Sequence, residues 1–215
     1  ETPTFTEFAN PANNGTLGGL ANVAAQRTRG FEVGVKGLLL QRLRYELAFY
    51  DMNVEDEVTA VINRGGRAFF NNADTDRTGV ELGIVAEIMQ GLDFTASYTY
   101  SDFEFDRFAR NVTAEGNTLP GVPRHYAYFE LDYAHASGFY AKWDWAVIGS
   151  IFADNANQTK VDNYDVSNLV FGYDYHHGRF TVSPNFGINN LFDEDYNQEI
   201  RIQAFGDRFF EPAPD

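Results

Sequence analysis

Residues 92–101 have the sequence Leu-Asp-Phe-Thr-Ala-Ser-Tyr-Thr-Tyr-Ser, in which every second side chain is apolar. A period of two is the repeat of a β-strand, because successive side chains point to opposite faces of a sheet. Such a strand has one apolar face and one polar face. Three other segments alternate in the same way: residues 43–49, 127–133 and 139–147. The sequence therefore predicts an all-β protein.

Alternation and turn residues together predict eight antiparallel strands, at residues 26–37, 41–54, 76–88, 92–103, 124–134, 139–150, 164–175 and 179–189. Short connections at 38–40, 89–91, 135–138 and 176–178 alternate strictly with long ones at 55–75, 104–123 and 151–163. Outer-membrane barrels have short periplasmic turns and long extracellular loops. A soluble β-sandwich, the alternative fold, has no reason to separate its loops by length. We therefore expect an antiparallel up-and-down transmembrane β-barrel.

The composition agrees with this class and excludes others. Aromatic residues make up 16% of the 215 residues, and several flank the predicted short turns, where a barrel carries an interfacial aromatic girdle. These are Tyr133, Phe139, Tyr173, Tyr175 and Phe180. The formal net charge of −15 argues against a nucleic-acid partner, because phosphate binding needs clustered Lys and Arg. Cysteine is absent, so disulfides and thiolate metal sites are excluded.

The sequence contains an internal repeat. Gly30-Phe31-Glu32-Val33-Gly34 recurs 49 residues later as Gly79-Val80-Glu81-Leu82-Gly83. Two strands and a turn repeated in this way are typical of a β-meander. Alternation places Glu32, Gly34, Glu81 and Gly83 on the inner face of the barrel, opposite Phe31, Val33, Val80, Leu82 and Ile84. Carboxylates on that face require a wet lumen or partners, because an isolated buried charge is too costly.

Six motifs resemble segments of TonB-dependent outer-membrane receptors, in the order in which that family carries them. They are Glu1–Asn10, the two Gly-x-Glu-x-Gly segments, Gly65–Asp74, Gly116–His125, Asn189–Tyr196 and Arg208–Pro214. The resemblance covers nearly the whole chain and is best to the siderophore-receptor branch of the family.

The resemblance implies a barrel of about 22 strands with a plugged lumen. Residues 1–215 would form its C-terminal portion, and we expect the N-terminal plug, the TonB-engaging segment and the last strand to lie outside this sequence. The implied function is active import of a scarce nutrient, such as a ferric siderophore, with energy from the TonB complex. Outer-membrane lipid and lipopolysaccharide would surround the barrel, and no cofactor is implied. Residues 190–215, 1–25 and the three long loops would face outward, and residues 175–178 the periplasm.

The loop after residues 92–103 carries the candidate ligand-binding residues. If the strand continues, Phe103, Phe105 and Arg107 keep inner parity, and Phe108, Arg110 and Asn111 follow in the loop. Aromatic rings and guanidinium groups could bind an anionic, aromatic iron chelate through stacking and charge-assisted hydrogen bonds. The alternative is a mobile, solvated loop without a ligand.

No catalytic or metal-binding residue is predicted. None of the four histidines lies in a recognisable catalytic or zinc arrangement, so a membrane-embedded hydrolase is not supported. At alternate positions, Asp51, Asn53, Glu55 and Glu57 begin like an EF-hand, but Asp56 and Ile62 occupy positions that need Gly and Glu. We interpret them as an acidic strand end above the bilayer.

An independent eight-stranded barrel with a structural or adhesion role is the alternative function. It would need the first and eighth strands to pair with each other. It would also need side chains to fill its interior, whereas Gly34, Gly83, Ser97 and Gly172 are small.

Overall fold

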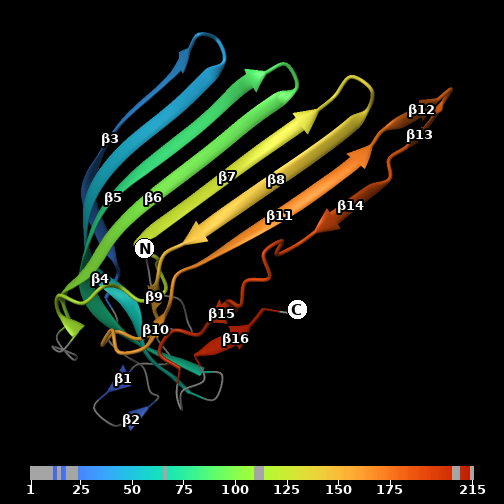
Figure 1. Ribbon diagram of the computed structural model, residues 1–215. Coiled ribbons are helices and arrows are strands. Elements are labelled where there is room, and N and C mark those ends of the chain that lie inside the picture. Colours follow the sequence, from blue (N-terminus) through green and yellow to red (C-terminus); the bar gives the residue numbers. More distant parts are fainter. Residues whose placement is uncertain are drawn as a thin grey trace.

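The computed structural model describes residues 12–13, 16–17, 24–64, 67–108, 114–204 and 209–213. The described part is built of antiparallel strands, eight of which form one sheet in the order β14-β11-β8-β7-β6-β5-β4-β3 (Figure 1). These strands are β3 (Arg27–Leu39), β4 (Leu43–Arg64), β5 (Arg67–Met89), β6 (Leu92–Arg107), β7 (His125–Ala134), β8 (Phe139–Ile148), β11 (Tyr164–Tyr173) and β14 (Asn185–Ile188). No helix among the described residues is long and apolar enough to cross a membrane.

Four small sheets accompany the large one, each of two short strands. They pair β1 (Ala12–Asn13) with β2 (Thr16–Leu17), β9 (Ile151–Phe152) with β10 (Lys160–Val161), β12 (Tyr175–His177) with β13 (Phe180–Val182), and β15 (Asn197–Ile200) with β16 (Phe210–Pro212). The β12–β13 pair lies within the hairpin predicted from residues 164–175 and 179–189, whereas the other three small sheets were not predicted, because strands of two to four residues are too short to show a period.

The register of the large sheet separates apolar from polar side chains. One row of direct cross-strand partners runs through Val35, Leu47, Leu82, Tyr98, Ala127 and Val147. A row of opposite parity runs through Arg44, Val85, Thr95, Glu130, Asp144 and Asn168. We call these two sides the apolar face and the polar face. The predicted placement of Glu32 and Glu81 opposite Val33 and Val80 is confirmed.

Short and long connections lie at opposite ends of the sheet, as predicted (Figure 1). We call these ends the turn end and the loop end. The turn after β3 has Leu40 and Gln41 at φ values of 51° and 58°, the left-handed region that two-residue hairpin turns need. Gly138 supplies a φ of 102° in the turn before β8, where a side chain would meet the Asp174 carbonyl oxygen.

The predicted long loop at residues 55–75 is wrong. β4 continues to Arg64 and β5 begins at Arg67, so the two strands form one long hairpin. Bulges between Val54 and Glu57 and between Ala60 and Ile62 shift the register. Each bulge adds a residue to one strand and so breaks the period of two. The strands were therefore not visible in the alternation.

Three other predicted boundaries also differ. β6 extends four residues beyond the predicted strand, to Arg107. The predicted strand 164–175 leaves the large sheet after Tyr173, and the predicted strand 179–189 is divided into β13 and β14 around Pro184. Proline lacks the N–H group that continues a ladder, although the Pro184 carbonyl accepts a hydrogen bond from the Tyr173 N–H at 3.1 Å.

The large sheet is open. Among the described strands, β3 and β14 form its two edges and do not pair with each other. The independent eight-stranded barrel required this pairing, so the described fold does not favour that alternative.

Tyrosine rings cover glycines on neighbouring strands at three places. The directly paired residues are Gly37 with Tyr45, Gly79 with Tyr50 and Gly172 with Tyr140. A Cβ atom on Gly79 would overlap the Tyr50 ring and would lie 2.8 Å from the Tyr100 carbonyl oxygen. Each ring fills the space that its glycine leaves, a device that stabilises glycine within sheets.

We therefore expect Gly79→Ala to lower the free energy of unfolding by about 1–3 kcal/mol, the usual range for overpacking. Gly83→Ala is the matched control, because a Cβ there meets only the Glu46 Cβ, at 3.9 Å. Urea titration of the detergent-refolded protein measures both. Equal stability of the two variants would contradict the role of the Tyr50 ring.

Candidate ligand-binding site at the loop end

Among the described residues, the two largest fully buried side chains, Phe105 and Phe108, lie at the loop end. Phe105 and Phe108 are 1% and 0% exposed, and their rings stack with centroids 5.2 Å apart. Ala73, Ala114 and Leu119 complete this hydrophobic cluster, against which Val61 and Phe103 pack. We call these residues the loop core. The segment after the cluster folds back along β6, since the Leu119 N–H donates to the Phe103 carbonyl at 2.8 Å.

The six predicted ligand-binding residues therefore have different environments. Phe105 and Phe108 are buried in the loop core, and Phe103 is half-buried at its edge. The Arg107 side chain is 69% exposed and pairs with Asp74. The inner parity predicted for Arg107 is wrong, because the register shift between Asp74 and Thr75 places Arg107 on the face opposite to Phe105. Arg110 and Asn111 lie outside the described residues. Ligand contact by any of the six stays a prediction, and Phe103 and Arg107 are the described members that a ligand could reach.

A charged and aromatic group on the polar face adjoins the loop core. The Arg77 guanidinium lies 5.3 Å from the centroid of the Phe103 ring and 2.5 Å from Glu57. The Thr75 hydroxyl donates to the same carboxylate at 2.5 Å, and the Tyr50 ring lies 6.3 Å from Phe103. Sequence reasoning missed Arg77 and Tyr50. The parity that Arg77 shares with Gly79 and Glu81 was the available signal.

The acidic run that begins like an EF-hand does not converge. Asp51 accepts a hydrogen bond from Thr78 at 2.9 Å, and Asn53 donates to Asp76 at 2.9 Å. Glu57 is turned to the polar face by the bulge, where it binds Arg77. In the ranges that the structure describes, no three His, Cys, Asp or Glu side chains gather as a metal site would require.

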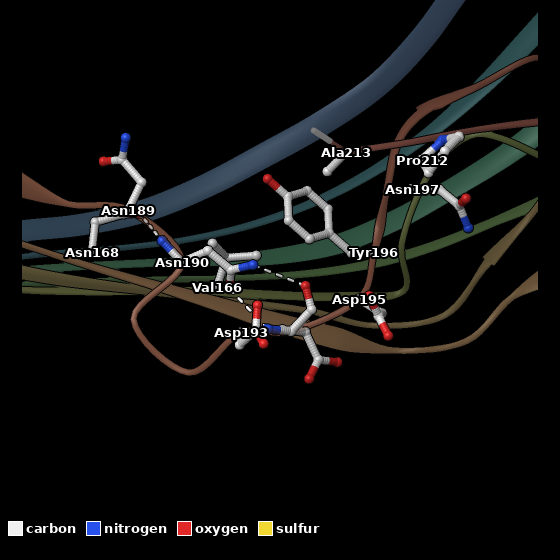
Figure 2. Close-up of a pocket in the computed structure, with 11 residues that line it drawn as sticks. Val166, Asn168, Asn189, Asn190, Asp193, Asp195, Tyr196, Asn197, Pro212 and Ala213 are labelled. Carbon is white, nitrogen blue, oxygen red and sulfur yellow. Dashed lines mark hydrogen bonds between the residues drawn. The ribbon is translucent and has the colours of Figure 1, made fainter. Parts of the chain in front are cut away.

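A cavity of about 830 Å³ lies on the polar face of β11, beneath the segment that follows β14. Its lining is polar: amides from Asn168, Asn189, Asn190 and Asn197, and acids from Asp193, Glu194 and Asp195. Asn190 fixes the covering segment by exchanging two 3.0 Å hydrogen bonds with the Glu194 backbone. Tyr196 stacks on Tyr164 with centroids 5.2 Å apart. In Figure 2, Asn190 lies on one side of the Tyr196 ring and Pro212 on the other.

A family model described as TonB dependent receptor-like, beta-barrel, matches residues 1–191. The ferrichrome outer membrane transporter/phage receptor of Escherichia coli strain K12 is 28% identical over 179 residues, which cover 80% of this chain and 23% of that protein. The ferric-pyoverdine BN7/BN8 receptor of Pseudomonas putida is 24% identical over 169 residues, which cover 78% of this chain and 19% of that receptor.

The solved structure of the copper transporter OprC has the same fold, with a TM-score of 0.74 at 21% identity. The match covers 99% of this chain and 33% of that one. The chain thus spans between about a fifth and a third of the length of these proteins. With its family match over residues 1–191, its antiparallel sheet and its two unlike faces, the chain belongs to the TonB-dependent receptor-like β-barrel family.

Proposed function

We propose that this chain is part of an outer-membrane receptor that imports a ferric siderophore with energy supplied through TonB. The match of residues 1–191 to the receptor barrel family carries the proposal. Two relatives named for ferrichrome and ferric pyoverdine support an iron chelate as cargo. The family consists of receptors and transporters rather than enzymes, and it belongs to the bacterial outer membrane.

The polar face at the loop end is where a ligand would bind. Phe103, Tyr50 and Arg77 offer rings and a cation on that face, and Arg107 offers an exposed guanidinium beyond the register shift at the end of β6. Planar chelates stack on aromatic rings, and guanidinium groups bind carboxylate or hydroxamate oxygens through paired hydrogen bonds. Phe105 and Phe108 then support the site from beneath without touching the ligand. The lipid-facing partner of the barrel would be outer-membrane lipid and lipopolysaccharide.

The function is tested by uptake in a bacterium that lacks its own siderophore receptors. Expression of the receptor should allow uptake of radioactive iron from at least one ferric siderophore, and only when TonB is present. Uptake that persists without TonB would contradict energised transport. Accumulation of copper without iron would replace the iron chelate as cargo by copper, the metal for which the transporter OprC is named.

A second prediction distinguishes candidate residues that contact the ligand from those that only support the loop core. Arg107→Gln should weaken chelate binding by about tenfold, the effect of one charge-assisted contact, without changing stability, since exposed ion pairs contribute little. Arg29→Gln is the control, because Arg29 is also exposed and pairs with Glu55 at 3.8 Å, but lies on the edge strand β3 instead of β6.

Phe108→Ala should instead lower the free energy of unfolding by about 3–5 kcal/mol, because it opens a cavity in the loop core. Calorimetric titration with the chelate measures affinity, and denaturant titration measures stability. If Arg107→Gln binds the chelate as tightly as Arg29→Gln, Arg107 is not a ligand residue.

A further inference from the structure

The turn between β9 and β10, residues 153–159, has a buried first half although it belongs to a loop. Ala153, Asp154 and Asn155 are 0%, 8% and 1% exposed. The turn has a fixed internal shape, because the Asp154 carboxylate accepts hydrogen bonds from the Gln158 and Thr159 N–H groups at 3.1 and 2.5 Å. A loop tip with this burial and this internal hydrogen bonding must pack against other parts of the chain.

Its main partner is the described segment that leads into β7, residues 114–124, which we call the β6–β7 loop. The Asn157 side chain donates to the Thr118 carbonyl and accepts from the Thr118 N–H, both at 2.9 Å. The Asn157 side chain thus makes with the Thr118 backbone both of the hydrogen bonds that a neighbouring strand would make. Two more hydrogen bonds join the same loops, from Asn117 to the Asn155 carbonyl at 2.9 Å and from the Gly121 N–H to the Phe152 carbonyl at 2.8 Å.

The turn also reaches two other segments. The Asn155 side chain donates to the Ala60 carbonyl on β4 at 3.2 Å. The Ala153 carbonyl accepts from the Gln203 N–H at 2.9 Å. Three stretches distant in sequence, namely β4, the β6–β7 loop and the segment after β14, are therefore bound to one turn.

The contact continues from Thr118 to the candidate ligand residues. The residues on either side of Thr118 bind β6: the Asn117 carbonyl accepts from the Phe105 N–H at 2.9 Å, and the Leu119 N–H donates to the Phe103 carbonyl at 2.8 Å. Thr118 itself bridges to Glu104. Asn157 is thereby connected to Phe103 through two residues of the neighbouring loop.

We propose that Asn157 is a positioning residue, and that residues 153–159 form a latch that holds the β6–β7 loop and the loop core in place as one preformed unit. A ligand on the polar face then meets loops that are already ordered. Loss of the latch would act through the mobility of the β6–β7 loop, because Asn157 bonds to Thr118 and lies outside the candidate site. The latch does not depend on the proposed function, whereas its effect on ligand binding rests on that function.

Asn157→Gly tests the latch while keeping the backbone of the turn. Asn157 has a φ of 55°, which glycine adopts freely. The variant removes the two hydrogen bonds to Thr118 and a weaker 3.3 Å bond from the side chain to the Asp154 carbonyl, but it keeps the bond from the Asn157 N–H to the same carbonyl. Amide hydrogen exchange of the protein purified from outer membranes should accelerate roughly tenfold or more at residues 114–119, as well as within the turn. Faster exchange in the turn alone would overturn the latch.

Two variants sharpen this result. Asn157→Asp keeps the acceptor for the Thr118 N–H and loses the donor, so its exchange should lie between that of the wild type and Asn157→Gly. Asn53→Ala is the control, because it removes one exposed amide hydrogen bond, to Asp76 at 2.9 Å, far from the turn. It should leave exchange at residues 114–119 unchanged, and an equal acceleration would overturn the assignment to Asn157.

Binding kinetics test the ligand part, with a ferric trihydroxamate as the probe. Dissociation from Asn157→Gly should be about tenfold faster, with association within about twofold of the wild type, because ordering of a loop chiefly affects retention. Unchanged dissociation despite faster exchange would overturn the positioning role and leave the latch. If the wild type binds no ferric chelate of any class, the proposed function fails, while hydrogen exchange still decides the latch.

Discussion

The structure depends on one constraint, namely that backbone groups within a bilayer must form hydrogen bonds where no water is present. Inside a bilayer each N–H and C=O group must find a partner in the protein, which only helices and closed sheets achieve. The chain pairs each strand of the large sheet with the next strand of that sheet along the sequence, from β3 to β14. Short turns at one end keep neighbours adjacent, and β3 and β14 form the two edges of the sheet among the described strands.

This pairing also places the side chains that face lipid and those that face water on opposite sides of the sheet. Val33 and Phe186 are 62% and 57% exposed, values that water would penalise and lipid favours. The polar face carries ion pairs such as Lys142 with Glu130, 2.8 Å apart. Among the described residues, close hydrophobic packing gathers at the loop end of the sheet. The loop core around Phe105 is that packing, and it places the candidate ligand residues on an ordered base.

The wall of the barrel was predictable from sequence, and the loop end was not. Residues 92–101 must present one face to lipid, so their period of two survives in the sequence. Above the bilayer this requirement ends: bulges near Glu57 break the alternation, and the strands at residues 55–75 were mistaken for a loop. The contacts of Asn157 with Thr118 depend on tertiary structure, for which a single sequence carries no signal. The aromatic spacing of Phe103, Phe105 and Phe108 was visible, but burial and ligand contact favour the same residue types.

Accessibility along β6 tests the account most directly. The chain contains no cysteine, so single cysteines carrying spin labels can be placed at successive positions from Asp93 to Phe105 in the membrane-embedded receptor. The account predicts that labels at even positions from Phe94 to Tyr100 respond to oxygen dissolved in lipid and that labels at odd positions respond to a water-soluble nickel chelate. A label at Phe105 should respond weakly to both, because that position is buried in the loop core. The same response at consecutive positions between Asp93 and Tyr100 would contradict a wall with one lipid face and one wet face.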